Sequence, residues 1–185
     1  QFRKTDQDWV ITSLTFILEQ ESGSRDILGD AVSIASADPA PYIRRQRAKA
    51  VVRDFLEGLE DIDMDRVNAV WADNAVQEMP FASHVLGFPD RIIGKEALIQ
   101  QYAGWPDNAI NPDYTSELRF YATQDPDLVV AEFRGKTMIR STNRLYDQRY
   151  VGVFHINAQG KIDLFREYFD PINFVNAFEL ADKAG

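Results

Sequence analysis

The chain has 185 residues, 45% hydrophobic and 12% aromatic, a length and composition typical of one folded domain with an extension. Its formal charge of −9 argues against nucleic acid and membrane surfaces as partners, because both attract basic proteins. The absence of cysteine excludes disulfides and thiolate chemistry, and two histidines are too few for a histidine-rich metal site, so we expect no metal and no other cofactor.

Residues 1–38 are expected to form an N-terminal extension of helix plus linker. Residues 7–20 carry apolar residues at i, i+4, i+7 and i+8, which predicts an amphipathic helix. Residues 22–38 are rich in Ser, Gly, Ala and Asp, as linkers are. No apolar run approaches the length of about 18 residues that a membrane-spanning helix needs. We expect a cytoplasmic protein, with secretion left open because the sequence starts at Gln1.

Residues 39–185 are expected to form the main domain, which begins with helices. The pair Asp38-Pro39 is a typical helix start, and an apolar stripe continues from there to about Glu60. A second helix is expected from Asp63 to about Trp71. Three shorter elements follow: a strand over residues 75–81, a return strand or loop over residues 85–93, and a helix over residues 94–104.

Strands dominate the second half of this domain. Apolar and β-branched runs separated by polar turns predict strands over residues 114–123, 128–140, 145–157 and 161–169, with a final helix after Asp170. Helices grouped first and strands grouped last favour an α+β fold with an antiparallel meander. The open end of a strongly twisted sheet of this kind is a preferred ligand site.

The strand motifs resemble those of SnoaL-like proteins. Residues 160–171 (GKIDLFREYFDP) are similar to the last strand of that family, and residues 152–154 and 94–98 match in type and spacing. The resemblance covers about residues 44–180. It implies an NTF2-like cone, named after nuclear transport factor 2 and shared with ketosteroid isomerase, in which helices pack in a curved, mostly antiparallel sheet. It also implies a homodimer that pairs through the outer face of the sheet.

Glu167 is the first candidate for catalysis. Period-2 alternation puts Phe165, Glu167 and Phe169 on one face of the last strand. If this face lines a pocket, desolvation raises the pKa of the carboxyl and suits it to general acid or base catalysis. The alternative is an outer face on which Glu167 forms a salt bridge. The last strand resembles that of phenazine-biosynthesis A/B proteins, which implies an acid/base role for Glu167.

Glu78 and Tyr150 are the other catalytic candidates. Alternation groups Glu78 with Val76 and Pro80, and Glu78 lies within one residue of the place where proteins resembling ketosteroid isomerase carry their general base. An exposed glutamate at a strand end is an equal alternative. Two carboxylates in one cavity would push their pKa values apart and give an acid and a base. Tyr150 is either a donor to a developing oxyanion or a structural residue.

Aromatic residues and a few polar ones are expected to line the pocket. Tyr102 and Trp105 would lie near its rim or in the core, and His84 would be a proton carrier or an exposed loop residue. The expected ligand-contacting residues are Tyr102, Trp105, Phe133, Gln148, Phe154, Phe165, Phe169, Phe174 and His84.

The chain is also similar to limonene-epoxide hydrolase, but Phe133 and Gly135 occupy the positions of its Arg-x-Asp pair, which argues against that chemistry. The leading hypothesis is a cofactor-free acid/base enzyme of secondary metabolism, an isomerase, dehydratase-type lyase or cyclase, acting on an apolar cyclic metabolite. The alternatives are a non-catalytic binding protein for a small apolar ligand and a dimeric interaction module.

Overall fold

The structure is a computed structural model that describes residues 2–4, 9–11, 40–82 and 89–179. The chain divides into two compact units, Gln1–Asp38 and Pro39–Gly185. In the first unit, strands β1 (Phe2–Lys4) and β2 (Trp9–Ile11) pair antiparallel. The prediction of a helix over residues 7–20 is therefore wrong at Trp9–Ile11, where aromatic and β-branched residues favour a strand. The remainder of that helix and the expected linker lie outside the described residues.

The second unit opens with two helices, α2 (Ala40–Asp61) and α3 (Met64–Ala69). Asp63 caps α3, since its carboxylate accepts a hydrogen bond of 3.0 Å from the backbone N–H of Arg66. The side chain of Arg66 also pairs with carboxylates of α2, which joins the two helices. Trp71 was expected on the second helix but begins a strand. None of the helices that the structure describes is long and apolar enough to cross a bilayer.

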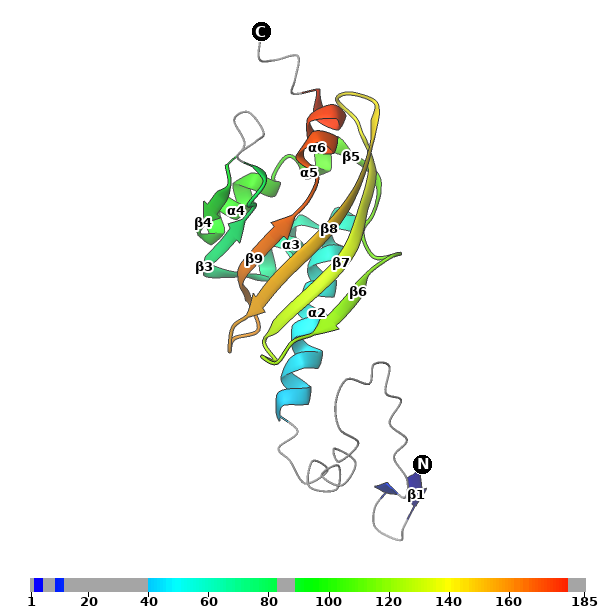
Figure 1. Cartoon of the computed structure of the whole chain (residues 1–185), viewed down its shortest axis with the longest axis vertical. Helices are drawn as coiled ribbons and strands as arrows, with labels where there is room; N and C mark the ends of the chain where they lie inside the picture. The colour runs from blue at the N-terminus through cyan, green and yellow to red at the C-terminus, as the bar shows by residue number, and fades with distance from the viewer. Residues whose placement is uncertain (1, 5–8, 12–39, 83–88, 180–185) are drawn as a thin grey trace. The chain divides into compact units, whose positions relative to one another are not determined.

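One curved sheet makes up most of the second unit (Figure 1). Its strands are β3 (Trp71–Glu78), β4 (Arg91–Ile93), β5 (Ala109–Asp113), β6 (Arg119–Ala122), β7 (Leu128–Ile139), β8 (Arg144–Ile156) and β9 (Ile162–Tyr168). The order across the sheet is β4-β3-β9-β8-β7-β5, with β6 also paired to β7. Strands β3 and β9 run parallel, and the other pairs are antiparallel. The α+β class with a mostly antiparallel sheet is confirmed.

The segment before β7 differs from the prediction of a single strand over residues 114–123. It contains a short helix α5 (Trp105–Asn108), which follows α4 (Lys95–Tyr102), and then the separate strands β5 and β6. Asn111 has a left-handed φ of 49°. Asp113 turns the chain by accepting a bond of 3.1 Å from the N–H of Ser116. Such turns interrupt the hydrogen bonding between strands at places that residue propensity alone does not reveal.

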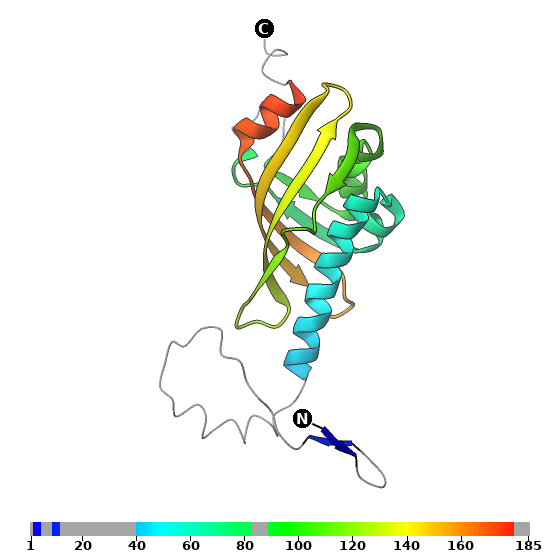
Figure 2. The same ribbon diagram turned by 90° about the vertical axis from the view of Figure 1, so that its right-hand side faces the viewer.

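Helix α2 crosses the inner face of the sheet (Figures 1 and 2). Phe55 of α2 makes edge-on ring contacts with Trp71, Phe154 and Phe165, and Phe154 stacks on Phe165 with ring centroids 4.2 Å apart. These rings bury the inner face over one part of the sheet. The final helix, α6 (Pro171–Phe178), packs against β8. A cavity remains between the helices and the sheet.

Candidate active site

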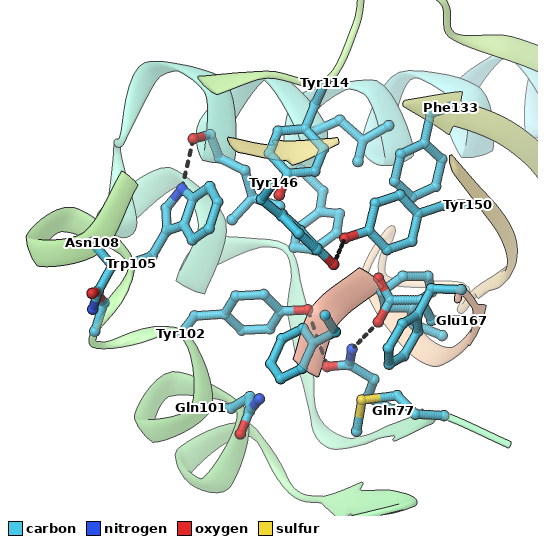
Figure 3. Close-up of a pocket in the computed structure, with 18 of the residues that line it drawn as sticks. Gln77, Gln101, Tyr102, Trp105, Asn108, Tyr114, Phe133, Tyr146, Tyr150 and Glu167 are labelled. Atoms are coloured by element: carbon cyan, nitrogen blue, oxygen red, sulfur yellow. Dashed lines mark hydrogen bonds between the residues drawn. The ribbon is translucent and has the colours of Figure 1, made fainter. Parts of the chain in front are cut away.

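A cavity of about 290 Å³ lies between the inner face of the sheet and helices α2, α4, α5 and α6 (Figure 3). The described residues that line it are Phe55, Leu56, Leu59, Gln77, Met79, Gln101, Tyr102, Gly104, Trp105, Asn108, Tyr114, Phe133, Tyr146, Tyr150, Phe165, Glu167, Phe169, Phe174 and Phe178. This lining is mostly aromatic, and the described part of it contains one carboxylate and no Lys, Arg or His. Such a surface suits an uncharged, largely apolar ligand.

Glu167 places its carboxyl group in this cavity. It lies on the inner face of β9 between Phe165 and Phe169, whose side chains are 1% and 7% exposed. Burial raises the pKa of Glu167 from its usual value near 4.5 to about 7, and a hydrogen bond from Gln77 acts in the opposite direction. At neutral pH this carboxyl can both release and accept a proton, which is what general acid/base catalysis requires.

Gln77 was missed by the sequence analysis, yet it is the side chain that contacts Glu167. Its Nε2 donates a hydrogen bond of 3.0 Å to Oε2 of Glu167, and its Oε1 accepts one of 3.0 Å from the hydroxyl of Tyr102. The contact arises because β3 lies beside β9, with Gln77 paired to Phe165. The signal in the sequence was the alternation of Gln77 with the apolar residues Ala75 and Met79, which are also buried.

Glu78 does not face the cavity, so the expectation of a second carboxylate there is wrong. Its Oε2 accepts a bond of 2.8 Å from Nε of Arg166, and Oε1 lies 3.8 Å from Nε of Arg91. The physical reason is the phase of β3. The buried positions of this segment are Ala75, Gln77 and Met79, so Glu78 belongs to the opposite face of the strand.

Two tyrosines of β8 form the opposite wall of the cavity. The hydroxyls of Tyr146 and Tyr150 lie 2.6 Å apart, and both side chains are buried. Tyr114, which follows β5, points into the same part of the cavity (Figure 3). Burial raises the pKa of all three phenols, so they stay protonated at neutral pH and can donate hydrogen bonds. Tyr114 and Tyr146 were not singled out from the sequence, although Tyr146 shares the alternation that pointed to Tyr150.

The structure brings most of the expected ligand-contacting residues together. Those that line the cavity are Tyr102, Trp105, Phe133, Phe165, Phe169 and Phe174. Gln148 and Phe154 do not line it, contrary to expectation. Gln148 instead holds the start of α6, donating a bond of 2.9 Å to the backbone oxygen of Asp170, and Phe154 is stacked in the core. His84 lies outside the described residues.

Metal-binding side chains are not gathered at this site. In the part of the chain that the structure describes, no three His, Asp or Glu side chains lie together as metal ligands would. The polar groups that point into the cavity are one carboxyl, several amides and phenol hydroxyls. These groups can transfer a proton and donate hydrogen bonds.

Comparison with known proteins agrees with this architecture. The SnoaL-like domain matches residues 52–165, more than half of the chain. The chain belongs to the SnoaL-like family. An uncharacterised PhzA/B-like protein of Pseudomonas aeruginosa is 26% identical over 134 residues, which are 70% of this chain and 89% of that protein. This relative is consistent with the resemblance to phenazine-biosynthesis proteins.

Solved structures of SnoaL-like and related proteins share the fold. A Bacillus subtilis protein that carries the provisional name of an isomerase is 28% identical, with a TM-score of 0.67, over 74% of this chain and 95% of that one. An NTF2-like protein of Burkholderia xenovorans is 21% identical, with a TM-score of 0.57, over 71% of this chain and 95% of that one. The expected NTF2-like fold is confirmed.

Proposed function

We propose that this SnoaL-like protein is an enzyme that moves a proton within a small, uncharged, cyclic metabolite, without a cofactor, as isomerases, cyclases and dehydratase-type lyases of secondary metabolism do. One observation carries the proposal. Glu167 is a carboxyl with a pKa of about 7 inside an aromatic cavity, and phenol hydroxyls point toward the same space. A carboxylate kept only for structure would be expected to pair with a cation, as Glu78 does with Arg166.

The reaction uses the two walls of the cavity in different ways. The carboxylate of Glu167 removes a proton from a carbon next to a carbonyl group, and the electron pair moves onto the carbonyl oxygen. Tyr150 or Tyr146 donates a hydrogen bond to that oxygen as its negative charge develops. Glu167, now protonated, returns the proton to a second carbon, or to a hydroxyl that leaves as water. The first outcome is isomerisation and the second is dehydration.

Two comparisons bear on this proposal. The Bacillus subtilis protein with the provisional isomerase name is 28% identical over most of its length. Epoxide hydrolysis of the limonene-epoxide hydrolase type has less support, because Phe133 lines the cavity where an arginine would be needed and the described lining contains neither arginine nor aspartate. Proton transfer is therefore the chemistry that the cavity favours.

The test is exchange of carbon-bound hydrogen in D₂O, followed by proton NMR with a cyclic ketone such as 2-tetralone as the probe. The protein should accelerate exchange at the carbon next to the carbonyl. Glu167→Gln should lower that rate by about 10²–10⁴-fold. Glu78→Gln is the matched control, since Glu78 is paired with Arg166 away from the cavity, and it should leave the rate nearly unchanged.

A different result would favour the alternative function. If ketones of this size bind, but exchange is no faster than in buffer or is unaffected by Glu167→Gln, the chain is a binding protein for apolar ligands. Affinity would then depend on the aromatic lining and change little on loss of the carboxyl.

We also propose that two copies of the chain pair through the outer face of the sheet. Leu145 and Val151 of β8 are 50% and 37% exposed there, and they lie on the same strand face as Arg149. A second copy packed on this face would remove both apolar side chains from water, which favours pairing. Light scattering of the purified protein at micromolar concentration tests this, and a dimer is expected.

A further inference from the structure

Three side chains from different elements form a continuous chain of hydrogen bonds that ends at the proposed proton carrier (Figure 3). Tyr102 of α4 donates to Oε1 of Gln77 over 3.0 Å, and Nε2 of Gln77 donates to Oε2 of Glu167 over 3.0 Å. Both bonds run in the same direction, from the phenol through the amide to the carboxyl. Bonds aligned in this way polarise one another, so the bond from Tyr102 strengthens the amide as a donor.

Gln77 is held in place at both of its polar atoms. Its side chain is 2% exposed, and Nε2 and Oε1 each make one hydrogen bond within the protein. The amide is placed by β3, which pairs with β9 so that Gln77 and Phe165 lie opposite each other. The hydrogen-bonding group beside Glu167 is thus fixed by backbone pairing on one side and by Tyr102 on the other.

The surroundings of Glu167 offer no competing charge among the described residues. The titratable groups that interact with it are Tyr102 from α4, Tyr114 after β5, and Tyr146 and Tyr150 from β8. All four are phenols that burial keeps neutral at pH 7. Helices α2 and α6 contribute only apolar side chains to this wall. The amide of Gln77 is therefore the group that distinguishes one carboxyl oxygen from the other.

We propose that Gln77, held by Tyr102, is a positioning residue that keeps Oε2 of Glu167 as a hydrogen-bond acceptor and so directs the transferred proton to Oε1. A proton on Oε2 would oppose the N–H of Gln77, since two donors would then face each other. Among the residues that the structure describes, none donates a hydrogen bond to Oε1, so this oxygen is left for the ligand. This inference rests on the proposed function for the identity of Glu167 as proton carrier, but it concerns a property of the resting protein.

The experiment is an NMR titration of Glu167, labelled with carbon-13 at its side-chain carboxyl, in the full chain and in Gln77→Leu. Leucine keeps most of the volume and removes the N–H, so the charged form of Glu167 loses its donor. The midpoint of titration should rise by about one pH unit. The acidic limb of the pH profile for 2-tetralone exchange should move by the same amount, with kcat reduced and KM changed little.

Tyr102→Phe provides the second variant, because it keeps the amide and removes only the bond that polarises it. It should move the midpoint in the same direction and by a smaller amount. A folded Gln77→Leu or Tyr102→Phe protein whose Glu167 titrates at the unchanged midpoint would overturn the inference. The midpoint could move as expected while neither the unaltered chain nor any variant exchanges the ketone. In that case the positioning role of Gln77 is supported and the proposed enzymatic function is wrong.

Discussion

The hydroxyl oxygens of Tyr146 and Tyr150 lie 2.6 Å apart in the wall of the cavity. The two residues are four positions apart on β8, so both point to the inner face. One O–H is used between them, and the other can donate to a ligand or to the hydroxyl of Tyr114. The two phenols thus act as a unit, and the structure allows either of them to present the free donor.

Loss of either phenol should weaken catalysis. We expect Tyr150→Phe and Tyr146→Phe each to lower the exchange rate of 2-tetralone by about 10–10³-fold, because a donor to the developing oxyanion is lost or misplaced. The double variant should be much less impaired than the product of the two effects predicts, since the residues act together. Tyr121→Phe is the control, because that hydroxyl bonds Glu132 at an exposed site. Equal effects of all three changes would contradict the assignment.

The stability of the protein should fall as pH rises through the range in which Glu167 ionises. Its pKa is about 7 in the folded chain and near 4.5 when exposed. At a pH between these two pKa values, the folded state still holds a proton that the unfolded state has released. Folding is therefore more favourable at lower pH. The contribution lost by neutral pH is on the order of 3 kcal/mol. Urea unfolding at pH 5 and pH 8 should show this loss, and Glu167→Gln should largely remove it.

Gly135 should not tolerate a side chain. A Cβ at this position would lie 2.7 Å from Cε1 of Tyr114 and 2.8 Å from Cε2 of Tyr150. Gly135→Ala must displace both rings or the strand itself, and overpacking of this kind costs about 1–3 kcal/mol. We expect a lower melting temperature and slower ketone exchange. Lys136→Ala, one residue along the same strand and exposed, should change neither.

Dimer formation through the outer face of the sheet can be tested by introducing one charged residue there. Val151→Asp should convert the proposed dimer to a monomer in light scattering, because the new carboxylate would be buried against the second copy. Ile43→Asp is the matched control. This residue is 59% exposed and lies on α2, the helix that crosses the inner face of the sheet. A monomer before any substitution, or a dimer that survives Val151→Asp, would count against the proposed interface.

In regular strands, the sequence correctly predicted which side chains face the cavity. Glu167 was identified because β9 alternates without interruption through Phe165 and Phe169, and this segment also resembles the family. Glu78 was assigned to the wrong face because the period-2 pattern groups it with the apolar Val76 and Pro80 as readily as it groups Gln77 with Ala75 and Met79. The role of Gln77 depends on a neighbour from another strand and on a hydroxyl from α4. Such contacts exist only after the elements have packed.

The parallel pairing of β3 with β9 also has a consequence for folding. Gln77 and Glu167 are separated by 90 positions in the chain, and contacts of such high sequence separation form slowly because a long loop must close first. The hairpin of β8 and β9 can form earlier, and in it Glu167 would still be hydrated and charged. Docking of β3 and the helices removes that water, so the last step of assembly should proceed more favourably in mildly acidic solution, where the carboxyl accepts its proton as it is enclosed.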